Sequence, residues 1–198
     1  MVLRQRLCAI VLAASVWQPG TASAGNPLPS LVGDKPSGRF CFNRVYDSAH
    51  LRRHPSQRTV STLASIEYEK SSASAWLRMQ LRLKGRDGPA NVVASCAWSE
   101  TANRDTSGNR MLPAFRGEEG FVCIALYNQQ SAEEAGTVLF DVAGDGKAVT
   151  VYFDDGIGLW ETPEPISQLE LHREDRDFLL KRAEDAACKT LEETLRPE

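Results

Sequence analysis

AWLRMQLRLK, residues 75–84, is the stretch of sequence that decides the fold. Large aliphatic side chains occupy every second position from Leu77 to Leu83. A strand sends alternate side chains to opposite faces, whereas a helix would scatter these residues around its circumference. The stretch therefore predicts a half-buried β-strand. Its apolar face consists of Leu77, Met79, Leu81 and Leu83, and its opposite face of Trp76, Arg78, Gln80 and Arg82.

The same period of two recurs along the chain. Residues 59–69 and 91–99 alternate in the same way, and residues 121–127 (FVCIALY) are apolar throughout, which is typical of a central strand. Residues 137–142 and 148–154 flank a glycine-containing turn and predict a hairpin. Short strands separated by turn signals indicate a mainly β fold, an antiparallel barrel-like or sandwich domain.

The remaining segments are less regular. The polar linker 100–110 is long for a hairpin turn, and we expect it to project from the domain. Residues 166–171 and 177–182 could form a hairpin turned at 173–176. Residues 183–195 carry Ala183, Ala187, Leu191 and Leu195 at helical spacing and predict a C-terminal helix.

The first 24 residues have the three parts of a secretory signal peptide. Arg4 and Arg6 precede an apolar run at 7–17, and Ala22-Ser23-Ala24 supplies the small residues of a cleavage site. The expected organisation is a signal peptide at 1–24, a flexible leader at 25–38 and one β-rich domain at 39–198. The predicted location is periplasmic or secreted.

Export determines how the cysteines are interpreted. Cys8 lies in the signal, and an even set of Cys41, Cys96, Cys123 and Cys188 remains. Such a set in an oxidising compartment predicts two disulfides. Four cysteines can be joined in pairs in three ways, and the sequence alone does not choose among them. Zinc is the competing interpretation, but the sequence contains no CxxC pair.

The charge balance argues against two classes of partner. The chain has 23 Lys and Arg against 26 Asp and Glu, a formal net charge of −3, and loss of Arg4 and Arg6 would make it more acidic. Phosphate backbones and anionic membrane surfaces both require a basic face. We therefore expect neither nucleic acid nor an anionic membrane surface as a partner. No apolar segment after residue 24 is long enough to span a bilayer, so we expect no membrane insertion, and a partner that is a protein, a glycan or a small ligand.

His50 and His54 are the candidate metal ligands. A spacing of four places both imidazoles on one side of a helical turn, where Asp47 or the distant His172 could add a ligand. The alternative is that Asp47 or Ser48 caps a one-turn helix that Pro55 ends. The proline also pushes His54 out of helical geometry, and no HExxH motif is present. We favour capping, and expect no metal or other cofactor.

Other chemistry has weaker support. The sequence contains no GxSxG or SxxK motif, and a Ser–His–Asp set is recognised by geometry rather than spacing. Trp76, Arg78, Arg82 and Arg86 could form an exposed ligand-binding strip. The alternative is the solvated face of an edge strand, with the tryptophan covered by a loop.

The segment from Cys41 to Asp47 (CFNRVYD), followed by His50-Leu51 and His54-Pro55-Ser56-Gln57, resembles the opening of certain uncharacterised exported proteins of Gram-negative bacteria. Those proteins are also β-rich and end near a cysteine, here Cys188. The resemblance carries no activity, so it transfers no functional residue. It implies a periplasmic location and a relationship between Cys41 and Cys188.

Two pairings follow as predictions. Cys96 and Cys123 lie on strands expected to be neighbours, which favours a bridge between them. Cys41 opens the first strand of the domain and Cys188 follows the last, so their bridge would tie the ends of the fold together.

The sequence predicts a non-catalytic binding module of the cell envelope, for which an inhibitor of an envelope-targeting enzyme is one concrete form. The alternative is a periplasmic hydrolase with a site around His50, His54 and nearby carboxylates. A deep pocket that holds a histidine beside a carboxylate would favour the enzyme. A shallow surface with a prominent loop at 100–110 would favour binding.

Overall fold

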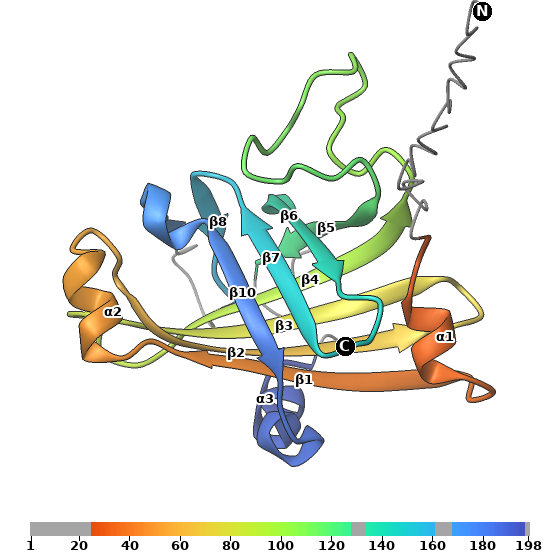
Figure 1. Cartoon of the computed structure of the whole chain (residues 1–198), viewed down its shortest axis with the longest axis horizontal. Coiled ribbons are helices and arrows are strands. Elements are labelled where there is room, and N and C mark those ends of the chain that lie inside the picture. The colour runs from red at the N-terminus through yellow and green to blue at the C-terminus, as the bar shows by residue number, and fades with distance from the viewer. Residues whose placement is uncertain (1–24, 128–133, 161–167, 197–198) are drawn as a thin grey trace, which may run out of the picture.

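The computed structural model describes residues 25–127, 134–160 and 168–196, and it forms a closed antiparallel barrel in the order β1-β10-β7-β6-β5-β4-β3-β2 (Figure 1). The mainly β prediction is confirmed, and of its two forms the barrel is the one observed. The barrel strands are β1 (Ser37–Val45), β2 (Thr59–Glu69), β3 (Ser74–Leu83), β4 (Ala90–Ser99), β5 (Gly120–Leu126), β6 (Glu134–Val142), β7 (Ala148–Phe153) and β10 (Asp177–Arg182). Three short helices, α1 (Leu28–Val32), α2 (Ser48–Arg53) and α3 (Lys189–Thr194), and two 3-10 turns, η1 (Arg173–Asp175) and η2 (Asp185–Cys188), accompany them.

Inward side chains fill the barrel. In β3, Leu77, Met79 and Leu81 are fully buried, which confirms the alternation predicted from the sequence. Phe121 of β5 stacks on Phe140 of β6 with ring centroids 4.5 Å apart. These side chains belong to one continuous apolar cluster that includes residues of every barrel strand. The interior is therefore a packed core.

Residues 25–38 differ from the expected flexible leader. The side chain of Asn26 accepts a hydrogen bond from the Leu28 amide at the start of α1. Leu28 and Val32 are four residues apart, face the same side and are both buried in the barrel cluster. Pro27 stands at the start of α1 and Gly33 at its end, so these residues bound the helix without separating the segment from the domain.

The C-terminal region contains the second difference. The hairpin predicted from 166–171 and 177–182 is not observed in its described part, because β9 (Gln168–Glu170) pairs with β8 (Gly156–Gly158). Strand β10 instead pairs with β1 on one side and β7 on the other, which closes the barrel. The choice of partner depends on strands far away in the sequence, and local patterning carries no signal for it.

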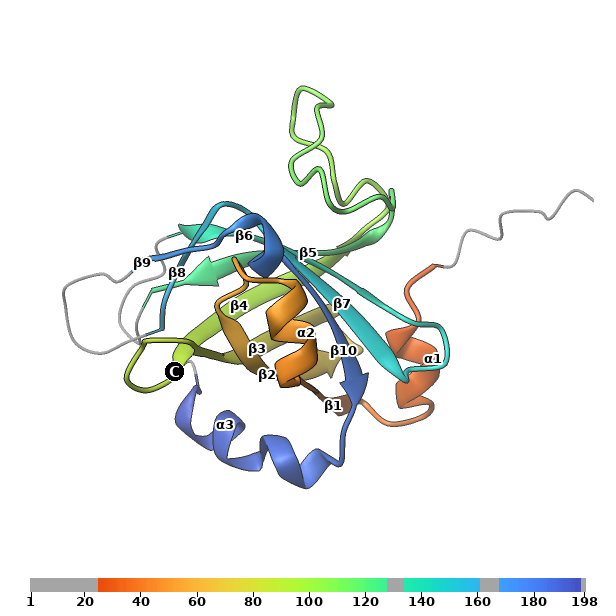
Figure 2. The same cartoon turned by 60° about the vertical axis from the view of Figure 1, so that its left-hand side comes forward.

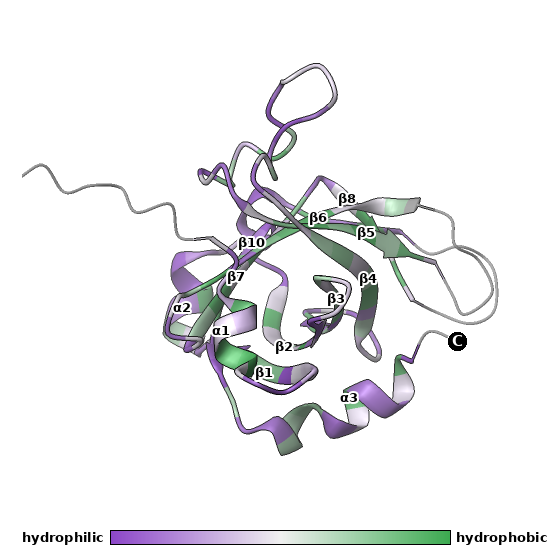
Figure 3. Ribbon diagram, turned by 90° about the vertical axis from the view of Figure 1, so that its right-hand side faces the viewer, coloured by the Kyte–Doolittle hydropathy of each residue, from purple (hydrophilic) through white to green (hydrophobic). Residues whose placement is uncertain are grey.

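The predicted C-terminal helix is present but shorter, because η2 precedes α3. In Figure 3, which looks along the barrel, the strands form a ring and α3 lies outside it. Leu191 and Leu195 are buried against Val93 and Trp160, while Leu63 and Trp76 pack around them. Helix α3 therefore covers part of the outer face of β2–β4.

The structure contains both predicted disulfides. Cys96 and Cys123 lie directly opposite each other on β4 and β5 and form one bridge, with S–S 2.10 Å. Cys41 of β1 and Cys188 of η2 form the other, with S–S 2.02 Å across 147 residues. The second bridge attaches the C-terminal segment to the barrel wall.

In the described part of the chain, no helix combines the length and the apolar character that membrane crossing requires. The predicted signal peptide at 1–24 lies outside the described residues.

Candidate functional site

A groove of about 570 Å³ opens where the barrel wall is least continuous. The register of β1 with β2 has nine Cα partner pairs, whereas that of β1 with β10 has two, Phe42–Arg182 and Asn43–Lys181. Beyond these pairs the strands diverge, and α2 lies beside the opening (Figure 1). The groove is lined by Arg44, Tyr46, His50, His54, Ser56, Gln57, Arg173, Glu174, Asp177 and Leu179.

Backbone geometry explains the opening. The Ala183 amide donates to the Cys41 carbonyl, so odd-numbered residues of both strands direct their backbone groups toward each other. The same register would pair Val45 with Leu179, but the observed pairs end before them. The Arg44 guanidinium instead donates to the Leu179 carbonyl at 3.2 Å. Val45 and Leu179 remain 76% and 50% exposed, so this end of the seam is open to solvent.

Helix α2 brings the two predicted histidines together. The Asp47 carboxylate accepts from the His50 amide at 2.7 Å, which confirms the capping interpretation and lowers the pKa of Asp47. His54 ends the helix with non-helical dihedrals before Pro55. Its ring nevertheless stacks on that of His50, with centroids 4.4 Å apart. The Tyr46 ring centroid lies 4.8 Å from that of His50, on the same wall of the groove. This wall is therefore a column of three rings.

Glu174 of η1 is the acidic partner in this groove. His54 Nδ1 lies 3.4 Å from Glu174 Oε1, and the Ser56 hydroxyl donates to the other carboxylate oxygen. The Ser56 hydrogen bond is the main cause of a lowered pKa at Glu174, and His54 lowers it further. The carboxylate thus lies between the serine and the histidine. A serine nucleophile requires the histidine between the serine and the acid, so this arrangement is not a catalytic relay.

The histidine nitrogens already have neighbours within the protein. His50 Nε2 lies 2.9 Å from Gln57 Oε1, and Gln57 Nε2 donates to the Thr59 carbonyl. Asp47 is engaged as the helix cap. Across residues 25–127, 134–160 and 168–196, no group of three or more His, Cys, Asp or Glu side chains is placed to share a metal ion.

The loop between β4 and β5, residues 100–119, projects away from the barrel as predicted for its first half (Figures 1 and 2). Asn103 holds its base: Nδ2 donates to the carbonyls of Leu112 (2.9 Å) and Phe115 (2.7 Å), while Oδ1 accepts from the Leu112 amide at 2.7 Å. Leu112 and Phe115 are buried with Ala102 against Leu139 of the barrel. The loop therefore has a small core of its own.

The outer half of this loop is held by polar contacts. Arg104 makes a two-nitrogen contact with both Glu118 oxygens, at 3.2 and 3.1 Å. Asp105 Oδ1 accepts from the amides of Ser107 and Asn109, and these contacts lower the Asp105 pKa, chiefly through Asn109. Residues 104–110 are all exposed. The tip is thus fixed in shape and presented to solvent.

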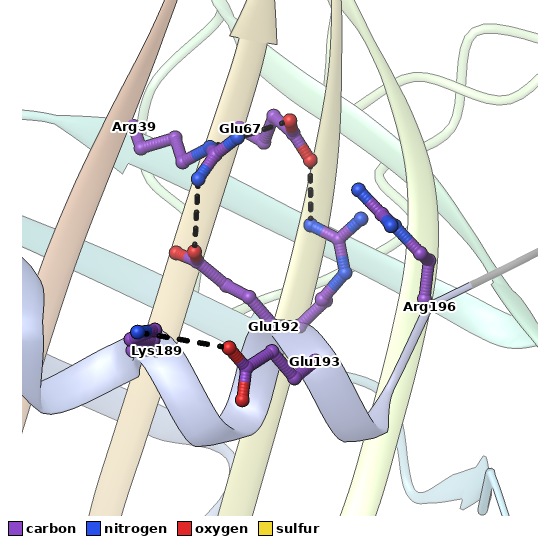
Figure 4. Close-up of a pocket in the computed structure, with 7 residues that line it drawn as sticks. Arg39, Glu67, Lys189, Glu192, Glu193 and Arg196 are labelled. Atoms are coloured by element: carbon purple, nitrogen blue, oxygen red, sulfur yellow. Dashed lines mark hydrogen bonds and ion pairs between the residues drawn. The ribbon is translucent and has the colours of Figure 1, made fainter.

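A second polar region lies beside α3, on the outer face of β1–β3 (Figure 4). Here Arg78 is only 4% exposed, and its guanidinium donates to the Leu195 carbonyl and to Glu67. The possible exposed strip of Trp76, Arg78, Arg82 and Arg86 is therefore wrong at Arg78. The edge-strand alternative is wrong as well, since β3 lies between β2 and β4. The residues around Arg78 could not indicate that α3, more than a hundred residues later in the sequence, would cover its side chain.

Neither a protein-family model nor a curated protein or solved structure matches the chain.

Proposed function

We propose that the protein is a non-catalytic binding module that docks the β4–β5 loop into a concave surface of a partner protein. The observation that carries this proposal is the pre-formed shape of the loop. Asn103 and the Arg104–Glu118 pair hold residues 100–119 together, while the tip at 104–110 stays exposed. An inhibitor that enters an enzyme cleft is the concrete form we favour.

Two physical arguments support this proposal. A loop that is ordered before binding loses little conformational entropy on association, so more of its contact energy appears as affinity. The barrel interior offers no competing site within the described strands, because their inward side chains pack into one cluster. Binding by this fold therefore takes place on its surface, and the loop is a prominent feature there.

The test compares two variants that each add one positive charge. Ser107→Lys changes the loop tip, and Ala143→Lys changes the exposed β6–β7 turn, which lies far from the loop tip in Figures 1 and 2. Immobilised protein is used to capture partners from an envelope extract, and each captured protein is purified and titrated by calorimetry. We expect direct binding that Ser107→Lys weakens at least about tenfold and that Ala143→Lys leaves unchanged. Equal affinity for both variants would rule out the loop as the docking element.

We also propose that the protein is exported. The two disulfides support this, since such bridges persist in oxidising compartments. N-terminal sequencing of the protein from the envelope fraction is expected to begin at Gly25. A chain that retains Met1 would contradict the proposal.

A hydrolase remains the second candidate, because the groove beside α2 does hold His54 next to Glu174. The lowered pKa of Glu174 makes this carboxyl a poor proton donor at neutral pH. Purified protein would be assayed on peptide, ester and glycoside substrates. Turnover that Glu174→Gln abolishes would place the enzyme first, and its absence in wild type would leave the binding module.

A further inference from the structure

The outer face of β1–β3 carries a polar trough beside the end of α3. It consists of two adjoining hollows, of about 250 and 530 Å³, which share Glu67, Arg78 and Arg196. The first continues along α3, and the second continues over β3 to Trp76. It is separate from the groove beside α2 and from the β4–β5 loop.

Strand register builds the floor of this trough. Arg39, Glu67 and Trp76 are direct neighbours across β1, β2 and β3. In the next row outward, Glu69 lies between Ser37 and Ser74. All six positions alternate with the buried inward residues and therefore face away from the core. An indole, two carboxylates, a guanidinium and two hydroxyls thus share one surface.

Most of the charged groups are oriented before any ligand arrives. Glu67 lies 3.1 Å from Arg78 and 3.5 Å from Arg39, and Arg39 lies 3.6 Å from Glu192 (Figure 4). Arg78 is anchored at 2.8 Å to the Leu195 carbonyl. Two acids and two arginines therefore compensate each other's charge, and their remaining lone pairs and N–H groups are available at fixed positions.

Trp76 and Arg196 are the two side chains of the trough that remain available for contact with a ligand. Trp76 packs against the cluster under α3, yet it remains partly exposed and lines the trough. The Arg196 side chain lies at the trough in Figure 4 and has no ion pair or hydrogen bond with any residue of the described ranges. An aromatic surface and a guanidinium without an ion pair among the described residues therefore lie beside a grid of polar groups that includes the Glu69 carboxylate, which is bonded to Ser71.

From this juxtaposition we propose that the trough binds an acidic saccharide. The apolar face of a sugar ring covers Trp76, the polar grid around Glu67 bonds its hydroxyls, and Arg196 pairs with its carboxylate. A guanidinium suits a carboxylate because its planar N–H groups match the two oxygens. The many fixed donors and acceptors favour a ligand with several hydroxyls over an apolar acid, which would leave them desolvated and unpaired.

Two matched ligand pairs test the proposal. Trigalacturonic acid is compared with its methyl ester, and 3′-sialyllactose with lactose, so that each pair isolates the acid group or the acidic sugar. Binding is measured by calorimetry and by the Trp76 indole N–H resonance, which Trp76→Phe assigns. Arg196→Gln removes the free guanidinium, and Arg52→Gln removes an exposed one on α2 as the charge-matched control. Thermal melting checks that each variant is folded.

We expect an acidic member of one pair to bind with Kd of about 1 mM or tighter and to exceed its neutral partner about tenfold. Arg196→Gln should abolish this preference while Arg52→Gln retains it, and the Trp76 resonance should shift on binding. No binding of either acid at about 10 mM would overturn the proposal. The proposal would also be overturned if acetate shifted the Trp76 resonance as much as the acidic saccharides do. A preference for the acid that survives Arg196→Gln would overturn it as well.

Discussion

Asn103→Ala is expected to open the β4–β5 loop while the barrel remains folded. The Asn103 side chain is 1% exposed and makes three hydrogen bonds to backbone groups of Leu112 and Phe115. At about 1 kcal/mol each, their loss destabilises the closed loop by about 3 kcal/mol. That energy corresponds to about a hundredfold rise in the population of the open loop.

Hydrogen exchange measures this population directly. Amide exchange at Leu112 and Phe115 should accelerate about a hundredfold, because exchange follows the free energy of local opening. Exchange in β3 should change far less, since the loop core and the barrel core are separate clusters. Asn109→Ala is the matched control, because Asn109 is exposed at the tip and its side chain makes one 3.3 Å bond. Unchanged exchange in Asn103→Ala, or equal acceleration throughout the barrel, would refute the reasoning.

Three further predictions concern stability. Leu81→Ala should lower the free energy of unfolding by about 2–5 kcal/mol, because Leu81 is fully buried, whereas partly exposed Gln80→Ala should stay within about 0.5 kcal/mol; equal losses in urea unfolding would contradict the inward and outward assignment. Replacing Cys41 and Cys188 by serine should cost about 5 kcal/mol in the chain-entropy model, since the bridge spans 147 residues; a variant with an unchanged urea midpoint would contradict it. The Glu174 pKa is lowered from 4.5 in the fold, so the stability contributed by the ionised group is complete above that value and is lost as pH falls through the lower folded value. The difference in urea midpoint between wild type and Glu174→Gln should therefore hold from about pH 7 to 5 and shrink below about pH 4; a constant difference would exclude this linkage.

The sequence was informative where structure depends on near neighbours. Strand alternation at 75–84, the Asp47 cap and the proximity of His50 and His54 all follow from residues within one strand or one turn. The cysteine pairing followed from where the strands lie in chain order. Each of these signals is present in the local pattern itself.

The parts that could not be predicted depend on contacts between distant segments. Glu174 reaches Ser56 and His54 across more than a hundred residues, and no spacing relates them. Arg78 occupies a formally outward position, and only the position of α3 buries it. Burial on the outer face of a strand is decided by what covers it, which strand periodicity does not encode.

The unequal sequence separations of the two disulfides have a consequence for the order in which they form. Cys96 and Cys123 are 27 residues apart on adjacent strands, so their thiols meet as soon as one hairpin forms. Under the proposed export, with the N-terminus entering first, Cys41 reaches the oxidising compartment well before its partner Cys188, 147 residues later. In the interval Cys41 is without its native partner and can exchange with Cys96 or Cys123. Maturation is therefore expected to include bridges between Cys41 and Cys96 or Cys123, which thiol–disulfide exchange must resolve before Cys41 pairs with Cys188.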